Sequence, residues 1–300
     1  MALDQYRGGS GEPLVLIHGI GHTWRGWKPM LPLLERDFEV LAVDLPGFGR
    51  SPSLPPGTEA TPEALADAVE GAMDEAGFQK AALCGNSLGG WIALELARRG
   101  RATSVVAISP AGLQHMREKA WGRNVLLGMR WGARNLPAPD ALLRSRLGSI
   151  LFAGPVVARP WRLDPDDFSE VLRMFAEAPG FLDTLPHTFG GQPKGLNEID
   201  VPVTILWGTR DLLLLPRQAK RFERLIPNAE LRDLDGLGHT PMSDDPELLA
   251  ELVATTSRAP RAAAPAEERP PRSPGRRRSS GSRSLRGRSA SDRRTRGCRH

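Results

Sequence analysis

The sequence predicts an α/β protein whose mostly parallel central sheet is flanked by helices. Short apolar runs alternate along the chain with stretches of helical spacing, which is typical of a parallel sheet. The runs are unbroken, as expected for strands buried on both faces. One of these strands also joins a helix directly through a glycine-rich turn at residues 85–90. The apolar runs cover residues 13–17, 38–43, 80–84, 104–108 and 203–207, and residues 229–234 are the last predicted strand.

Two helices beside the sheet are marked by signals at their ends. Residues 61–76 have helical spacing, with Thr61 as the N-cap and Pro62 in the first turn. Residues 88–99 form the second predicted helix, and Gly100 ends it.

One long region interrupts this alternation. Residues 112–200 contain helical patterns separated by prolines and no convincing strand, and they are too many and too apolar for a plain loop. We therefore expect a helical cap over the carboxyl ends of the strands, where open α/β sheets bind ligands. The core then consists of residues 1–111 and 201–256. The expected cap helices cover residues 121–131, 140–152 and 166–178.

The last segment, residues 257–300, differs in composition from the rest of the chain. It holds fourteen arginines, three acidic residues and one large aliphatic residue, so its net charge is +11. The whole chain carries +5, so the first 256 residues carry −6. Such a segment buries too little apolar surface to offset the entropy of ordering, and we expect a disordered basic tail. A basic arm could bind nucleic acid. Because no aromatic residue interleaves with the arginines, we expect no nucleic-acid partner and interpret the tail as a solvated appendage.

Composition limits the class of protein further. No apolar stretch reaches the roughly 20 residues that a membrane helix needs, and the first residues lack the regions of a signal peptide. With only Cys84 and Cys298, we expect no disulfide framework and a reducing cytoplasm. No His, Cys and carboxylate cluster has metal-ligand spacing, and the glycines of residues 44–51 lack the Gly-Lys-Ser/Thr ending of a phosphate-binding loop. We therefore expect neither a metal nor another cofactor.

The glycine-rich turn predicts a nucleophile. Residues 85–89 read Gly-Asn-Ser-Leu-Gly, a G-x-S-x-G pattern between a predicted strand and a predicted helix. A sharp strand-to-helix turn brings neighbouring residues very close, and Gly85 and Gly89 have no Cβ to collide there. The turn lifts the hydroxyl of Ser87 above the sheet and places it at a helix N-terminus, which favours developing negative charge.

A serine nucleophile needs a base and an acid that orients the base. His239 follows the last predicted strand, in a loop that can reach the same edge of the sheet, and we expect it to be the general base. Asp211 directly follows the strand at 203–207 and is our candidate for the acid. Asp233 and Asp235 are rivals, but they lie on or beside the last strand.

Hydrolysis of an acyl group also needs donors for the oxyanion. The backbone N–H of Leu88 is one candidate, and that of Ile20, in the loop after the first apolar run, is the other. We expect His18 to be structural, with its ring bonded to the backbone. His22 lies in the same loop and is expected either at the mouth of the site or in ordinary packing.

The motifs HGIGHTWRGW, DLPGFGRS, GNSLGG, WGTRD and GLGH, in this order, resemble the α/β-hydrolase superfamily, in its cap-bearing branch of esterases, lipases and carbon–carbon hydrolases. The resemblance covers residues 12–250. It implies an α/β-hydrolase fold with an inserted helical cap, and the same triad of Ser87, Asp211 and His239. Epoxide hydrolases and haloalkane dehalogenases of similar outline place Asp at the nucleophile position, so Ser87 argues against both activities.

The leading functional hypothesis is a serine hydrolase that cleaves the carboxylic ester of a small apolar substrate through an acyl-enzyme. Carbon–carbon bond hydrolysis, lactone opening and cofactor-free perhydrolysis on the same triad are alternatives. Relatives that cleave carbon–carbon bonds carry Trp after the histidine and Pro in the early loop, where this chain has Thr240 and His22. A binding protein without catalytic activity is the alternative from another class.

Overall fold

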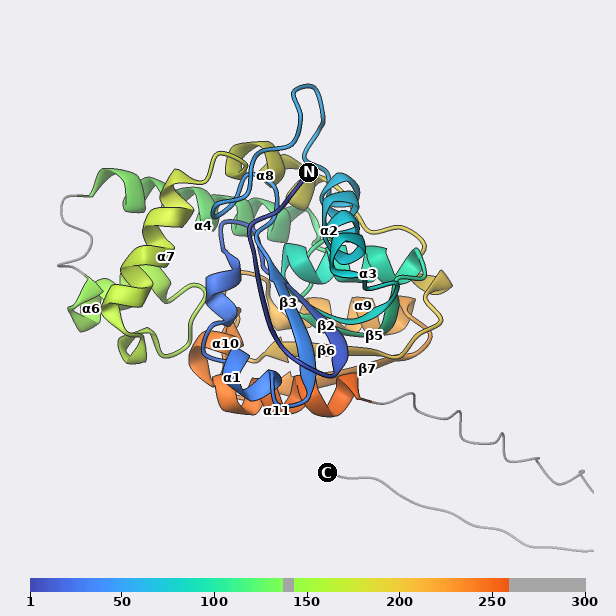
Figure 1. Ribbon diagram of the computed structural model, residues 1–300. Coiled ribbons are helices and arrows are strands. Elements are labelled where there is room, and N and C mark those ends of the chain that lie inside the picture. Colours follow the sequence, from blue (N-terminus) through green and yellow to red (C-terminus); the bar gives the residue numbers. More distant parts are fainter. Residues whose placement is uncertain (137–142, 259–300) are drawn as a thin grey trace, which may run out of the picture. The chain divides into compact units, whose positions relative to one another are not determined.

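A computed structural model describes residues 1–136 and 143–258, and these form one seven-stranded sheet in the order β1-β3-β2-β4-β5-β6-β7 (Figure 1). Strands β2 to β7 are parallel, and β1 pairs antiparallel with β3 at the edge. The predicted mostly parallel sheet is therefore confirmed. The strands are β1 (Gln5–Gly9), β2 (Glu12–Ile17), β3 (Phe38–Val43), β4 (Ala81–Asn86), β5 (Ala102–Ile108), β6 (Val203–Gly208) and β7 (Ala229–Leu234).

The edge strand β1 was not predicted. Its sequence, QYRGG, has no apolar run, and its residues alternate between exposed and half-buried. An edge strand of this kind carries little hydrophobic signal, because it buries no continuous face.

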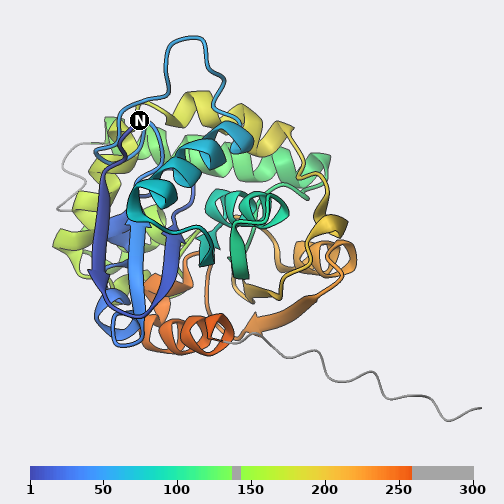
Figure 2. The same cartoon turned by 45° about the vertical axis from the view of Figure 1, so that its right-hand side comes forward.

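Helices cover both faces of the sheet (Figures 1 and 2). Strand side chains alternate between two apolar clusters: Val15 and Leu83 pack with α2 and α3, and Leu16 and Ala82 pack with α1 and α11. The helices of the core are α1 (Leu31–Leu34), α2 (Pro62–Ala76), α3 (Leu88–Arg98), α9 (Ala219–Leu225), α10 (Pro241–Asp244) and α11 (Pro246–Ser257).

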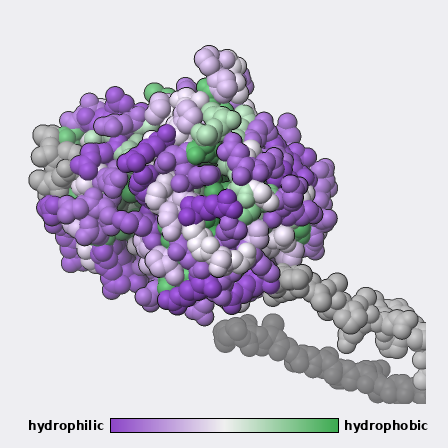
Figure 3. All heavy atoms as spheres, viewed as in Figure 1, coloured by the Kyte–Doolittle hydropathy of each residue, from purple (hydrophilic) through white to green (hydrophobic). Residues whose placement is uncertain are grey.

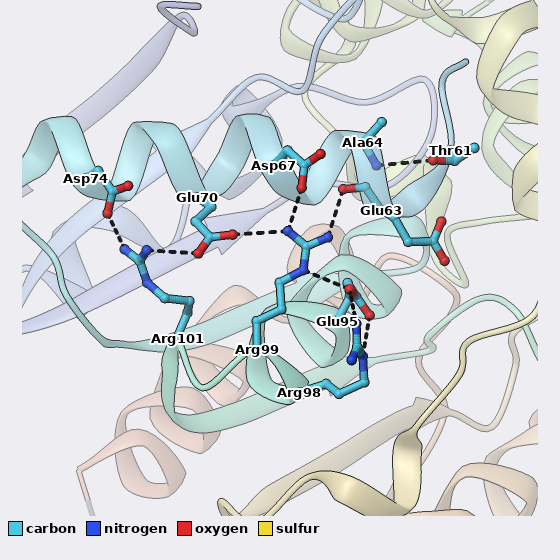
Figure 4. A network of polar contacts seen from close by, with 10 residues as sticks. All are labelled: Thr61, Glu63, Ala64, Asp67, Glu70, Asp74, Glu95, Arg98, Arg99 and Arg101. Atoms are coloured by element: carbon cyan, nitrogen blue, oxygen red, sulfur yellow. Dashed lines mark hydrogen bonds and ion pairs between the residues drawn. The ribbon is translucent and has the colours of Figure 1, made fainter. Parts of the chain in front are cut away.

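The ends of α2 follow the predicted signals. The hydroxyl of Thr61 accepts the N–H of Ala64 at 3.1 Å, and Gly77 ends the helix at φ 82°. Helix α2 also pairs with α3 through charged side chains (Figure 4). Arg99 donates to Asp67 and Glu70 of α2 at 2.6 and 3.1 Å. Its Nε also donates to the buried Glu95 at 2.8 Å, so one guanidinium joins the two helices.

The regular elements described between β5 and β6 are all helices, and they lie together to one side of the sheet (Figure 1). We call residues 112–200 the cap. Helices α4 and α7 correspond to the predictions at 121–131 and 166–178, and the prediction at 140–152 lies partly outside the described residues. The cap helices are α4 (Met116–Asn135), α6 (Arg146–Ala153), α7 (Pro165–Glu177) and α8 (Phe181–Gly190).

Helix α8 was not predicted, and Pro186 lies inside it, where a proline signals a break. Helix α11 runs to Ser257, and the predicted tail beyond Arg258 lies outside the described residues. The face of the molecule seen in Figure 3 is largely hydrophilic. None of the helices in the described part of the chain has the length and apolar character needed to span a membrane.

Candidate active site

Ser87 lies at the turn between β4 and α3 and has a strained backbone conformation, with φ 57° and ψ −115°. The turn is as tight as the glycine pattern predicted: a Cβ on Gly85 would lie 2.1 Å from the carbonyl oxygen of Gly89. A Cβ on Gly89 would in turn lie 2.1 Å from the carbonyl oxygen of Ile17. Any larger residue at either position would therefore displace the turn, which is the sharp turn of a nucleophile elbow.

His239 and Asp211 are in direct contact. Nδ1 of His239 donates to Oδ2 of Asp211 at 2.7 Å, and both side chains are buried. Oδ1 of Asp211 accepts the backbone N–H groups of Leu213 and Leu214 at 2.9 and 2.8 Å, so both carboxylate oxygens are fixed. With its proton on Nδ1, a neutral imidazole presents Nε2 as an acceptor, which is the tautomer a general base needs.

The structure brings His239 to the turn that carries Ser87. Nδ2 of Asn86 donates to the backbone carbonyl of His239 at 2.9 Å and to that of Ile108 at 3.3 Å. Ser87 and His239 also line one cavity. Asn86, which stands inside the G-x-S-x-G pattern but is not among the predicted site residues, therefore joins the turn at Ser87 to the backbone of His239.

The two candidate oxyanion donors belong to two segments next to Ser87. Leu88 is the first residue of α3, where backbone N–H groups have no partner within the helix. Ile20 lines the cavity. Its neighbour Gly19 is so close to Ser87 that a Cβ there would lie 3.1 Å from Cβ of Ser87. This arrangement can surround a carbonyl oxygen near Ser87 with donors, as acyl transfer requires.

The loop after β2 contains two further histidines. Nδ1 of His18 donates to the carbonyl of Gly19 at 2.7 Å, and Nε2 accepts the N–H of Leu45 at 2.9 Å, so this ring is held by backbone as expected. Burial lowers the pKa of His18 to about 3, which keeps it neutral. His22 lines the cavity, and burial together with the nearby His239 lowers its pKa.

The cavity has a volume of about 430 Å³, which suits a small molecule. Apolar side chains from the cap form much of its wall, with charged side chains such as Arg25 and Glu170 also lining it. In the described part of the chain, no group of His, Cys, Asp and Glu side chains is arranged to hold a metal ion. The apolar lining from the cap consists of Leu126, Met129, Val156, Val157, Leu163, Phe168, Val171, Leu172 and Phe175.

The cap is anchored close to the candidate acid. Glu118 of α4 is buried and accepts hydrogen bonds from Arg217 at 2.6 Å and Arg221 at 2.5 Å. Burial raises the pKa of Glu118, but the hydrogen bonds from the two arginines and a backbone N–H outweigh it and hold the pKa at about 2. One turn further along α4, Nε1 of Trp121 donates to the carbonyl of Leu212 at 2.8 Å. The cap therefore contacts the segment that follows the candidate acid.

Comparison with known proteins identifies the class to which this fold and this site belong. The model of the alpha/beta hydrolase family matches residues 14–252, and the chain belongs to this family. Family membership and the hydrolases among its relatives support hydrolase activity.

Among the relatives is a protein from Mycobacterium tuberculosis named epoxide hydrolase EphH, 32% identical over 206 residues, with 64% of this chain and 92% of that protein covered. Another is the 2-hydroxy-6-oxononadienedioate/2-hydroxy-6-oxononatrienedioate hydrolase of Cupriavidus pinatubonensis, 27% identical, with 77% and 82% covered. Among solved structures, a thermophilic esterase from Thermogutta terrifontis superimposes with a TM-score of 0.68 at 24% identity. That match covers 84% of this chain and 92% of the esterase, and it supports the fold.

Proposed function

We propose that the protein is a serine hydrolase that cleaves the carboxylic ester of a small apolar substrate through an acyl-enzyme. The observation that carries the proposal is the site itself. Ser87, on a strained turn, shares an apolar cavity with His239, and His239 is hydrogen-bonded to Asp211 at 2.7 Å. We also propose that the protein acts in the cytoplasm, as the near absence of cysteine suggests.

In the proposed reaction, Oγ of Ser87 attacks the ester carbonyl carbon while Nε2 of His239 takes its proton. The N–H groups of Ile20 and Leu88 donate to the oxyanion, and Asp211 stabilises the imidazolium. The imidazolium then protonates the departing alkoxide, which leaves as the alcohol. Water attacks the acyl-enzyme as His239 accepts its proton, and return of that proton to Ser87 releases the acid.

The composition of the cavity supports an apolar substrate, because side chains of Leu, Val, Phe and Met from the cap form much of its wall. Ser87 supports acyl transfer over epoxide opening, which in similar folds uses an aspartate at this position. The similarity to the Cupriavidus enzyme, together with the Gly-Asn-Ser sequence, favours carbon–carbon hydrolysis as the second candidate.

The test is labelling of the wild type and Ser87→Ala by a fluorophosphonate probe, with turnover of p-nitrophenyl esters of increasing acyl length. We expect labelling and ester hydrolysis in the wild type and neither in Ser87→Ala. A matched control is Ser104→Ala, because Ser104 is a buried serine on the neighbouring strand β5. This variant should be labelled and active like the wild type.

The wild type and Ser87→Ala should also be tested for turnover of a lactone, an epoxide and a vinylogous 1,5-diketone. Faster turnover of the diketone than of any ester would favour the carbon–carbon hydrolase. Full activity of Ser87→Ala on the best substrate would contradict the proposed nucleophile. If a small ligand bound tightly and no substrate were turned over, the protein would be a binding protein.

A further inference from the structure

The loop that carries His239 is held on both sides by contacts that do not involve the triad. The backbone N–H of Gly238 donates to Oδ2 of Asp244 at 2.8 Å. On the other side of His239, the N–H of Thr240 donates to the carbonyl of Val156 at 2.9 Å, and its hydroxyl donates to the same oxygen at 3.1 Å. Val156 belongs to the cap, so part of the support for the histidine comes from the cap.

Asp244 joins the histidine loop to the same segment of the cap. In addition to Gly238, its carboxylate accepts the N–H of Ala158 on Oδ2 at 3.1 Å and the N–H of Arg159 on Oδ1 at 2.9 Å. Hydrogen bonds to an ionised carboxylate are about twice as strong as neutral ones. One half-buried side chain at the end of α10 therefore connects three backbone donors from two segments that are about 80 residues apart in sequence.

The two segments are also packed directly against each other. A Cβ on Gly238 would lie 2.7 Å from the carbonyl oxygen of Val156 and 2.8 Å from the backbone nitrogen of Ala158. Val156 and Val157 line the cavity beside His239. The cap segment that lines the cavity is thus also the segment that supports the histidine loop.

We propose that Asp244 is a positioning residue that fixes the imidazole of His239 by bonding its loop to residues 158 and 159 of the cap. The general base is then correctly oriented only while this cap segment is in place. The inference rests on the proposed function, in which His239 is the base.

The test compares Asp244→Ala and Asp244→Asn with the control Asp245→Ala. Asp245 is the neighbouring aspartate, and its carboxylate also accepts a backbone N–H, that of Leu248 at 3.1 Å, but as the N-cap of α11. Both alanine variants lose hydrogen bonds to backbone and should lower the melting temperature. Only Asp244→Ala should release the histidine loop.

The measurements are kcat and KM for the best substrate, and the strongly deshielded NMR signal of the proton between Nδ1 of His239 and Asp211. We expect Asp244→Ala to lower kcat about 10- to 100-fold, because a displacement of about 1 Å in a catalytic group can cost 100-fold. KM should change much less, and the deshielded signal should shift or broaden. Asp244→Asn, which keeps one acceptor oxygen, should lie between Asp244→Ala and the wild type. Asp245→Ala should match the wild type in kcat and in the NMR signal.

An Asp244→Ala protein with wild-type kcat and an unchanged NMR signal would overturn the proposal, whatever its melting temperature. If Asp244→Ala does not fold, the same two measurements on Asp244→Asn decide. Failure of the proposed function is separate. It would appear as full activity of Ser87→Ala, and in that case the NMR signal, which needs no turnover, would still decide whether Asp244 positions His239.

Discussion

Replacement of Asp211 by asparagine tests the candidate triad at the residue whose two side-chain oxygens both accept hydrogen bonds. Both carboxylate oxygens are used: Oδ2 accepts from Nδ1 of His239 at 2.7 Å, and Oδ1 accepts from Leu213 and Leu214 at 2.9 and 2.8 Å. Asparagine has the same shape but only one acceptor oxygen. Its NH₂ group must therefore point either at the two backbone donors or at the imidazole.

The backbone N–H groups cannot give up their protons, whereas the imidazole can move its proton from one nitrogen to the other. We therefore expect the oxygen of Asn to stay with the backbone and its NH₂ group to donate to Nδ1 of His239. The imidazole proton then sits on Nε2, and a protonated Nε2 cannot accept the proton of Ser87. The wrong tautomer in a serine triad lowers kcat about 10⁴-fold, equal to about 5.5 kcal/mol of transition-state stabilisation. KM should change little, because His239 lines the cavity and Asp211 does not.

The assay is steady-state hydrolysis of an activated aryl ester at high enzyme concentration, so that a residual rate stays measurable. The control is Asp235→Asn, an exposed acid near the same loop whose Oδ1 accepts the hydroxyl of Thr209 in a long contact of 3.3 Å. It should retain kcat within twofold. A loss below tenfold in Asp211→Asn, or an equal loss in both variants, would refute the reasoning about the acid.

Two further predictions concern stability. Burial lowers the pKa of His18 to about 3 in the folded protein, against about 6.5 in the unfolded chain, so only the unfolded chain takes up the proton below pH 6.5. His18 therefore causes no loss of stability above pH 6.5, and below it the contribution of His18 should lower the free energy of unfolding by up to about 1.4 kcal/mol per pH unit. Urea unfolding between pH 6.5 and 5 should show the wild type losing stability more steeply than His18→Gln, because the other titrating groups are common to both proteins, and parallel curves would contradict this. Arg99→Ala should lower the free energy of unfolding by about 2 kcal/mol, because it leaves the buried Glu95 with fewer partners. Arg7→Ala, which removes a more exposed ion pair with 46% of the arginine side chain exposed, should cost at most about 1 kcal/mol by the same measurement, and equal losses would contradict the role assigned to burial.

The fold could be predicted where burial imposes a pattern. Strands β2 to β6 lie inside the sheet and are largely buried, so apolar residues dominate their sequences and make them easy to recognise. Strand β7 lies at the other edge of the sheet and is only partly buried. The edge strand β1 has an exposed face and a polar sequence, and it is fixed by pairing with β3, which is not visible in its own residues. Helix α8 contains Pro186, so its local sequence indicates a break that packing in the cap overrides.

The candidate site could be predicted where the chemistry depends on residue type and local backbone. The tight turn at Ser87 requires Gly85 and Gly89, and this leaves a recognisable pattern. The roles of Ser87, Asp211 and His239 remain predictions, to which the structure adds the direct contact between the acid and the histidine. The contact from Asn86 to the carbonyl of His239 joins residues 153 positions apart, and nothing in either local sequence indicates it.

The contacts between the cap and the histidine loop could not be predicted from the sequence, because they depend little on residue type. They are made largely by backbone groups, at Val156, Ala158 and Arg159, and every residue except proline offers the same N–H and carbonyl. Among these contacts, Asp244 is the residue that takes part through a charged side chain, and beside Asp245 it resembles an ordinary helix cap. If Asp244 acts as proposed, the cap cannot be exchanged as a separate specificity element. Changes at residues 156–159 would then alter kcat through the orientation of the imidazole, in addition to altering KM through the apolar wall of the cavity.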